Sequence, residues 1–435
     1  MSDPPQPLGP FGGFDLSQML RFLQSDGPVH WEVARQVAHW VALEGEEETT
    51  SVSAADRERL SEVATAAEQR VLAETGEAPP SPSVALLGRA EWADQALTTL
   101  RPVLERLAVS LQGDLPDLTA EAGGPDSPFA GNPFAGNPLE GSPFGGNPFA
   151  GLFGPGIGAG EPGTPGGPGA NPLAGMAGMF GALGPLLLGV QCGFMVGQLA
   201  QGLLSEHDLL LPIADPPRAS LIVPNLERFH IAWSIPADDL RFYMALGEGV
   251  RSRIAARPWV RERLVGLASE YVSSFRVDTA ALESQLGSID LSDPSSFEGA
   301  MLDPDAMLGA MQSPEQMAVL GRFQLTTAVL ESYADFVVER LAEPMIKSLP
   351  TIREAMRRHR VERSEADRFI QRLLGLDPSR RLHDQAAAFC RGVEERAGSQ
   401  ALDRLTEAES MLPTPAELEA PGLWLARIEL FGGET

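Results

Sequence analysis

The strongest constraint on the fold of this chain is an apolar stretch, residues 173–204, which contains no Asp, Glu, Lys or Arg. A helix of this length is long enough to cross a bilayer. Three glycines recur in it at four-residue spacing, on one helix face: Gly189, Gly193 and Gly197. Pro185 interrupts the stretch, and the nearest basic residues, Arg106 and Arg218, are too far away to flank a membrane span. The pattern favours a buried central helix whose glycines let a neighbouring helix approach closely. The alternative is a membrane-associated protein that inserts residues 173–204.

A different composition precedes this stretch. Residues 127–151 form five tandem pentapeptides, each with Ser or Asn first, Pro second and Gly last, and Gly/Pro-rich sequence continues to about residue 170. Proline at every fifth position removes hydrogen-bond donors and blocks helix formation, and glycine raises the entropy of the unfolded chain. We therefore predict a flexible insertion over residues 122–170. The alternative is that its phenylalanines act as weak multivalent binding sites: Phe129, Phe134, Phe144 and Phe149.

Helical spacing of apolar residues dominates the rest of the chain. The predicted helices span residues 14–23, 31–41, 56–73, 83–111, 270–275, 314–341, 350–360, 365–374 and 382–397. Strands should be few, because long alternating runs of β-branched residues are missing. One or two short strands are expected between 212 and 225, where the sequence is short, apolar and bounded by prolines. The predicted organisation is mainly α: a disordered N-terminus (1–13), then a helical part (14–121) that packs with residues 171–435 as one domain around the insertion.

The charge and the cysteine content limit the possible partners of the chain and the compartment in which it works. The formal net charge is −26, and no cluster of Lys and Arg offers the basic face that phosphate binding requires, which excludes nucleic acid as an expected partner. Cys192 and Cys390 are far apart, with no metal-ligand spacing, and predict two buried thiols in a reducing cytoplasm. The first residues carry neither a basic segment nor an apolar core, so no signal peptide is expected.

The candidate site lies at residues 247–251, Gly-Glu-Gly-Val-Arg. A helix of the His-Glu-x-x-His type binds zinc through two His four residues apart, because both imidazoles then project from one face. The Glu between them takes a proton from the metal-bound water. Here Glu248 is present, but Gly247 has no side chain and Arg251 stays protonated, so neither can bind zinc. The six histidines are scattered singly, and each is interpreted as a surface or capping residue: His30, His39, His207, His230, His359 and His383.

Several longer segments resemble one family. The chain is similar to actinobacterial zincin-like proteins, described as hydrolases or zinc-dependent metalloproteases, over most of its length outside 122–170. The segments that carry the resemblance begin at Gly27, Arg89, Val223, Ile235, Thr327 and Leu373, and Pro258 and Trp259 follow the motif helix. This resemblance implies a zincin-like helical domain with a degenerate motif.

The resemblance also implies residue roles. Glu248 matches the general base of the motif, and Glu331, in the run Glu331-Ser-Tyr-Ala-Asp335, resembles the helix that supplies the third zinc ligand; the alternative for Glu331 is a helix-surface carboxylate. Loss of zinc would leave Glu248 and Glu331 as close carboxylates that need a cation. Arg251 is one turn from Gly247, so we expect its guanidinium to pair with Glu248, Glu331 or both.

Three functions remain open. The first is a zincin-like protein that has lost both zinc-binding His and acts without catalysis as a binding or scaffold protein, with a protein partner that the sequence does not identify. The second is an active hydrolase that uses Glu248 with an atypical metal site or with no metal. The third is the membrane-associated protein described above. No cofactor is expected, and zinc only where other ligands rescue the degenerate site.

Overall fold

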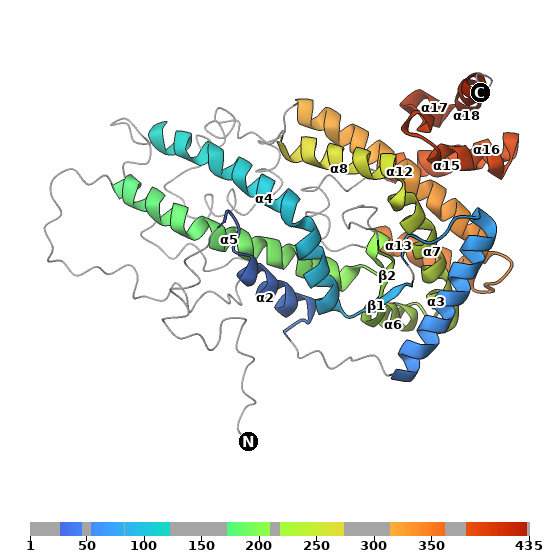
Figure 1. The fold of residues 1–435 in the computed structure, drawn as a ribbon, viewed down its shortest axis with the longest axis horizontal. Coiled ribbons are helices and arrows are strands. Elements are labelled where there is room, and N and C mark those ends of the chain that lie inside the picture. The colour runs from blue at the N-terminus through green and yellow to red at the C-terminus, as the bar shows by residue number, and fades with distance from the viewer. Residues whose placement is uncertain are drawn as a thin grey trace, which may run out of the picture.

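The computed structural model describes residues 27–45, 54–81, 83–121, 172–208, 218–273, 314–361 and 380–432. Over these residues the fold is mainly α-helical with two short strands, as predicted (Figure 1). The predicted helices at 14–23 and 365–374, the disordered N-terminus and the insertion at 122–170 lie outside the described residues.

One group of helices is built around the apolar stretch. It contains α2 (Trp31–Ala42), α4 (Arg89–Glu121) and α5 (Pro172–Gly202). In Figure 1, α2 lies along the second half of α5, and α4 runs beside them. The predicted buried helix is confirmed for most described side chains of α5: Val196, Leu199 and Ala200 are almost completely buried, whereas Gln191 is exposed.

The glycine face of α5 is the surface on which α2 packs. A Cβ built at Gly193 would lie 2.3 Å from the carbonyl oxygen of Ala34, and one at Gly189 would lie 2.5 Å from the carbonyl oxygen of His30. A Cβ at Gly197 would lie 2.6 Å from the Cβ of Val41. Real Cβ atoms do not approach so closely, so the four-residue glycine spacing is what allows the two backbones to come together.

A second group of helices surrounds α7 (Ala237–Ala256). Its members are α3 (Ala54–Thr75), α6 (Val223–Ala232), α8 (Pro258–Ser273), α12 (Pro314–Ala342) and α13 (Leu349–Val361). The helices α3, α6, α8 and α12 pack directly on α7. Every residue of α7 from Tyr243 to Ala255 is buried, so the candidate motif lies on the innermost helix of this group.

The two strands connect these groups. β1 (Ala85–Leu87) pairs in parallel with β2 (Ser220–Ile222), in the register Ala85 to Ser220. The position of β2 agrees with the predicted strand region. The prediction that the helix extends back to residue 83 is wrong, because residues 85–87 are extended and α4 begins only at Arg89. The backbone groups of this apolar run find their partners in a neighbouring strand, which local helical spacing does not reveal.

The C-terminal elements form a smaller layer on α12. They are α15 (Arg380–Ala397), α16 (Ser399–Asp403), α17 (Pro415–Glu419) and α18 (Pro421–Gly432), together with η2 (Arg404–Thr406) and η3 (Glu409–Met411). Trp424 of α18 is completely buried and meets Phe389 of α15 edge to face, with ring centroids 5.4 Å apart. Its indole N–H donates to the carbonyl oxygen of Met411 at 2.7 Å. A single aromatic side chain therefore joins three elements of this layer.

Two further features concern the thiols and the apolar helices. Cys192 and Cys390 are both free and buried, as predicted, and burial raises the pKa of each thiol to about 12.

Within the ranges given above, no helix combines the length and hydropathy that crossing a membrane would need.

The α2–α5 contact leads to the first testable prediction. Replacing Gly193 by alanine (G193A) should lower the melting temperature, because the added methyl group meets the Ala34 carbonyl oxygen and forces the helices apart. Overpacking of this kind costs about 1–3 kcal/mol. The control is G266A, inside α8, where an added Cβ meets nothing within 4 Å. Because alanine favours helix over glycine by about 1 kcal/mol, this control should be neutral or stabilising. Thermal unfolding followed by circular dichroism measures both, and equal melting temperatures would contradict the assigned contact.

Candidate functional site

The carboxylate of Glu248 is completely buried and is held by three donors. Its Oε1 accepts from the Nδ1–H of His207 at 2.8 Å and from the backbone N–H of Ser220 at 2.9 Å. Its Oε2 accepts from the backbone N–H of His207 at 3.2 Å. His207 belongs to the short 3-10 helix η1 (Glu206–Asp208) that follows α5, and Ser220 begins β2. Glu248 therefore ties the centre of α7 to the chain segment between the two groups of helices.

His207 carries the charge that balances this carboxylate. Burial alone would lower the pKa of His207, but the carboxylates of Glu248 and Glu206 outweigh that effect, so its pKa is raised. Glu206 accepts from the indole N–H of Trp92 at 2.9 Å and from the hydroxyl of Ser220 at 3.3 Å. Burial and the nearby Glu248 raise the pKa of Glu206. The result is a buried imidazolium–carboxylate pair with a second carboxyl group beside it.

The space beside Gly247 is occupied by the side chain of Arg251. Gly247 has no side chain, and a Cβ built there would lie 2.7 Å from Nη1 of Arg251. The guanidinium of Arg251 therefore folds back over the helix surface at Gly247, one turn earlier. Any larger side chain at position 247 would have to displace it.

Arg251 pairs with α12 and not with Glu248. Its Nη2 donates to Oδ1 of Asp335, and both side chains are largely buried, at 9% and 20% exposure. Nε2 of His383, on α15, lies 4.0 Å from Oδ2 of the same aspartate. Asp335 thus joins α7, α12 and α15 through one carboxylate.

This geometry corrects two predictions. The expected ion pair from Arg251 to Glu248 or Glu331 is wrong, because its partner is Asp335, one helical turn beyond Glu331. Glu248 and Glu331 were expected to face each other across two packed helices; α7 and α12 do pack together, but Glu248 is directed to η1 and β2. The side chain of Glu331 is partly buried.

The histidines divide into one buried exception and five others. His207 is buried, contrary to the surface or capping interpretation. The other five are at least partly exposed, and each has a polar contact. These contacts are His30 with the backbone N–H of Val33, His39 with Asp94, His230 with Glu227, His359 with the carbonyl oxygen of Gly202, and His383 with Asp335. Only the flanking acids Glu206 and Asp208 mark His207 in the sequence. Its contact with Glu248 joins residues 41 positions apart, which local spacing does not predict.

The residues at the motif positions do not fit a zinc ion. Zinc is held by thiolate, imidazole and carboxylate ligands in a tetrahedral arrangement. Here one position has no side chain, another carries a guanidinium, and the oxygens of Glu248 are occupied by N–H donors. Elsewhere in the described part of the chain, no group of three or more His, Cys, Asp or Glu is arranged to hold a metal.

Comparison with known proteins agrees with this helical fold. A family model described as "Zincin-like metallopeptidase" matches residues 29–425. A crystal structure of a protein from Chloroflexus aurantiacus, described as a "putative hydrolase with a novel fold", matches with a TM-score of 0.58 and 20% sequence identity. The match covers 92% of this chain and 99% of that one. At this identity the likeness concerns the fold alone. No curated protein matches the sequence.

The buried pair predicts a pH dependence of stability. The pKa of His207 is raised above its ordinary 6.5 in the folded protein, so its contribution is complete below pH 6.5 and is lost as the pH rises through the folded value. The raised pKa of Glu206 acts in the same direction. The free energy of unfolding should therefore fall more steeply as the pH rises above 6.5 in the wild type than in His207→Gln, as measured by urea titration.

A surface ion pair provides the control for this experiment. His39, which contacts Asp94 at 2.8 Å with its side chain 35% exposed, should tolerate His39→Gln with a change of about 0–1 kcal/mol. Breaking the buried pair with His207→Gln should cost about 3–5 kcal/mol at pH 6. Parallel pH profiles for the wild type and His207→Gln would refute the assignment.

The pairing of Arg251 with Asp335 gives a third prediction. Arg251→Ala should destabilise the protein by about 3–5 kcal/mol, because it leaves the Asp335 carboxylate without its guanidinium partner. Arg358→Ala, at a side chain that is 52% exposed and bonded to Glu354, should change stability by about 0–1 kcal/mol. In a double-mutant cycle, Asp335→Asn should couple strongly to Arg251→Ala, whereas Glu331→Gln should not. Coupling to Glu331 instead would restore the original expectation.

Proposed function

The chain belongs to the zincin-like metallopeptidase family, and we propose that it is a non-catalytic member that acts as a binding or scaffold protein. A zincin active site needs two His ligands, a metal-bound water and a carboxylate free to receive a proton. This chain keeps the helix and the glutamate of that arrangement, while other side chains occupy the space and charge of the metal site.

One observation carries the proposal: the guanidinium of Arg251 lies where a ligand at position 247 would have to project. Because a Cβ at Gly247 would lie 2.7 Å from Nη1 of Arg251, an imidazole could project there only if the guanidinium moved away from this position. A fixed positive charge at this point also repels a divalent cation. The same guanidinium neutralises Asp335, so it replaces one function of a metal, namely the balancing of buried carboxylate charge.

The state of Glu248 supports the same proposal. A general base must reach its proton at hydrogen-bond distance, directly or through one water. Glu248 is completely buried, and the donors that hold it all belong to the protein backbone or to His207. Its role in this arrangement is to hold η1 and β2 against α7.

The test compares metal content and hydrolysis in the full-length protein. We expect far less than one zinc per chain by elemental mass spectrometry of untagged protein, before and after incubation with zinc. We also expect no cleavage of casein or of a fluorogenic peptide library. One zinc per chain, or cleavage that Glu248→Gln abolishes while circular dichroism shows an intact fold, would establish the hydrolase alternative.

A pair of variants tests whether Arg251 is the obstacle. Gly247→His alone should lower the melting temperature, because the new side chain meets the guanidinium of Arg251. The double variant with Arg251→His removes this contact and places two imidazoles on one helix face, so it should bind zinc more tightly than either single variant. Equal zinc affinity in the wild type and the double variant would contradict the role given to Arg251.

A further inference from the structure

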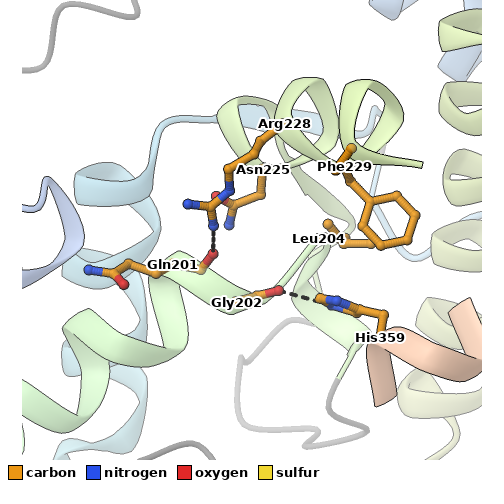
Figure 2. A pocket seen from close by; sticks show the side chains of 8 residues that line it. Gln201, Gly202, Leu204, Asn225, Arg228, Phe229 and His359 are labelled. Carbon is orange, nitrogen blue, oxygen red and sulfur yellow. Dashed lines mark hydrogen bonds between the residues drawn. The ribbon is translucent and has the colours of Figure 1, made fainter. Parts of the chain in front are cut away.

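A pocket of about 240 Å3 lies between the C-terminal end of α5, helix α6 and the end of α13 (Figure 2). Its lining residues are Gln201, Gly202, Leu204, Asn225, Arg228, Phe229, Ala232 and His359. Neither Glu248 nor Glu331 is among them. The volume is a little below the roughly 300–1,000 Å3 of pockets for drug-sized ligands, so it suits a small molecule.

The polar side of the pocket is formed by Arg228 and Asn225, and the backbone acceptors of the pocket are already engaged. In Figure 2, Arg228 donates from Nη2 to the carbonyl oxygen of Gln201 at 2.5 Å, and His359 donates from Nε2 to that of Gly202 at 3.1 Å. The buried amide of Asn225 donates to the carbonyl oxygens of Ala200 and Leu203, at 2.8 and 2.6 Å. The partial negative charge at the end of α5 is therefore capped by the protein's own donors.

Among the residues that the structure describes, two guanidinium groups on this side face a single carboxylate. Arg89 and Arg228 both contact the same oxygen, Oε1 of Glu44, at 3.3 Å. Burial and the nearby Arg228 lower the pKa of Arg89, whose side chain is only 14% exposed. The neighbouring carboxylate, Glu227, is paired with Arg241. Two guanidinium groups thus share one carboxylate at the edge of the pocket, in a chain whose formal net charge is −26.

The opposite side of the pocket is apolar. Leu204 and Phe229 are buried, and Ala232 is exposed at the surface. The ring of Phe229 meets the His359 imidazole edge to face, with centroids 5.2 Å apart. In Figure 2 the Phe229 ring lies beside Leu204, across from the group formed by Arg228 and Asn225. A ligand in this pocket would therefore have a charged end and an apolar end.

We propose that this pocket binds a small carboxylic acid with an aromatic or aliphatic body. The carboxylate would pair with Arg228, whose side chain is 52% exposed and whose planar guanidinium suits this group. The apolar body would pack against Leu204 and Phe229. An added carboxylate balances the excess positive charge of Arg89 and Arg228, whereas an amine would be repelled by both.

The experiment uses three probes with one body and different head groups: 3-phenylpropanoate, 3-phenylpropanamide and 3-phenylpropylamine. Saturation-transfer NMR and isothermal titration calorimetry on the full-length protein measure their binding. The acid should bind saturably and at least about 10-fold more tightly than the amide, since a charge-assisted hydrogen bond supplies that difference. Added salt should weaken the acid but leave the amide unchanged.

Matched variants locate the site. Arg228→Gln should weaken the acid about 10-fold and leave the amide unaffected. Arg358→Gln, a nearby arginine outside the pocket lining, should have no effect. Ala232→Trp should block both probes by filling the mouth, while Ile231→Trp, at an adjacent side chain that is 70% exposed, should not. Equal binding of the amine and the acid, binding unaffected by Ala232→Trp, or no saturable binding of any probe up to 10 mM would each overturn the proposal. None of these outcomes depends on whether the protein binds zinc.

Discussion

The constraint on which this structure depends is the burial of charged groups along α7. A charge removed from water must be paired, because its desolvation costs several kcal/mol. Each such group on α7 finds its partner on a different surrounding element. The pairs are Arg241 with Glu227 of α6, Glu248 with His207 of η1, Arg251 with Asp335 of α12, and Arg253 with Glu68 of α3. These pairs fix the rotation of α7 and the registers of its neighbours, since a shifted neighbour would leave a buried charge unpaired.

The same constraint shows how the residues at the motif positions are accommodated in a buried helix. In a zinc site the metal balances ligand charge and links separate elements. In this chain Arg251 supplies a positive charge one turn from Gly247 and links α7 to α12. His207 supplies another at Glu248 and links α7 to the segment after α5. At these positions, protein side chains thus provide both the charge balance and the cross-links that a metal provides in a zinc site.

Features of the structure could be predicted from the sequence where they depend on the spacing of residues within a single helix. The glycines of α5 lie at four-residue spacing, and the close approach of α2 follows from that spacing. The absence of histidine at positions 247 and 251 was equally clear from the sequence. The ion-pair partners of the charged residues on α7 could not be predicted from the sequence, because they depend on how the helices pack together. Asp335 and Glu331 lie on the same face of α12, one turn apart, and only the register between α7 and α12 decides which of them meets Arg251. The strand at residues 85–87 was missed because its hydrogen bonds go to β2, far along the chain.

The end of α5 places the pocket and the buried pair on one short segment. Leu204 lines the pocket, its N–H donates to Oδ2 of Asp208 at 2.8 Å, and its carbonyl oxygen accepts from the N–H of Ile222 at 3.0 Å. His207, which bonds Glu248, lies between Leu204 and Asp208 in the same turn. A ligand that packs on Leu204 therefore acts on a segment whose other contacts include the central ion pair of α7. A ligand that binds only the folded state would stabilise it by RT ln(1 + L/Kd), where L is the free ligand concentration, and the hydrogen bonds of this turn join its site to α7.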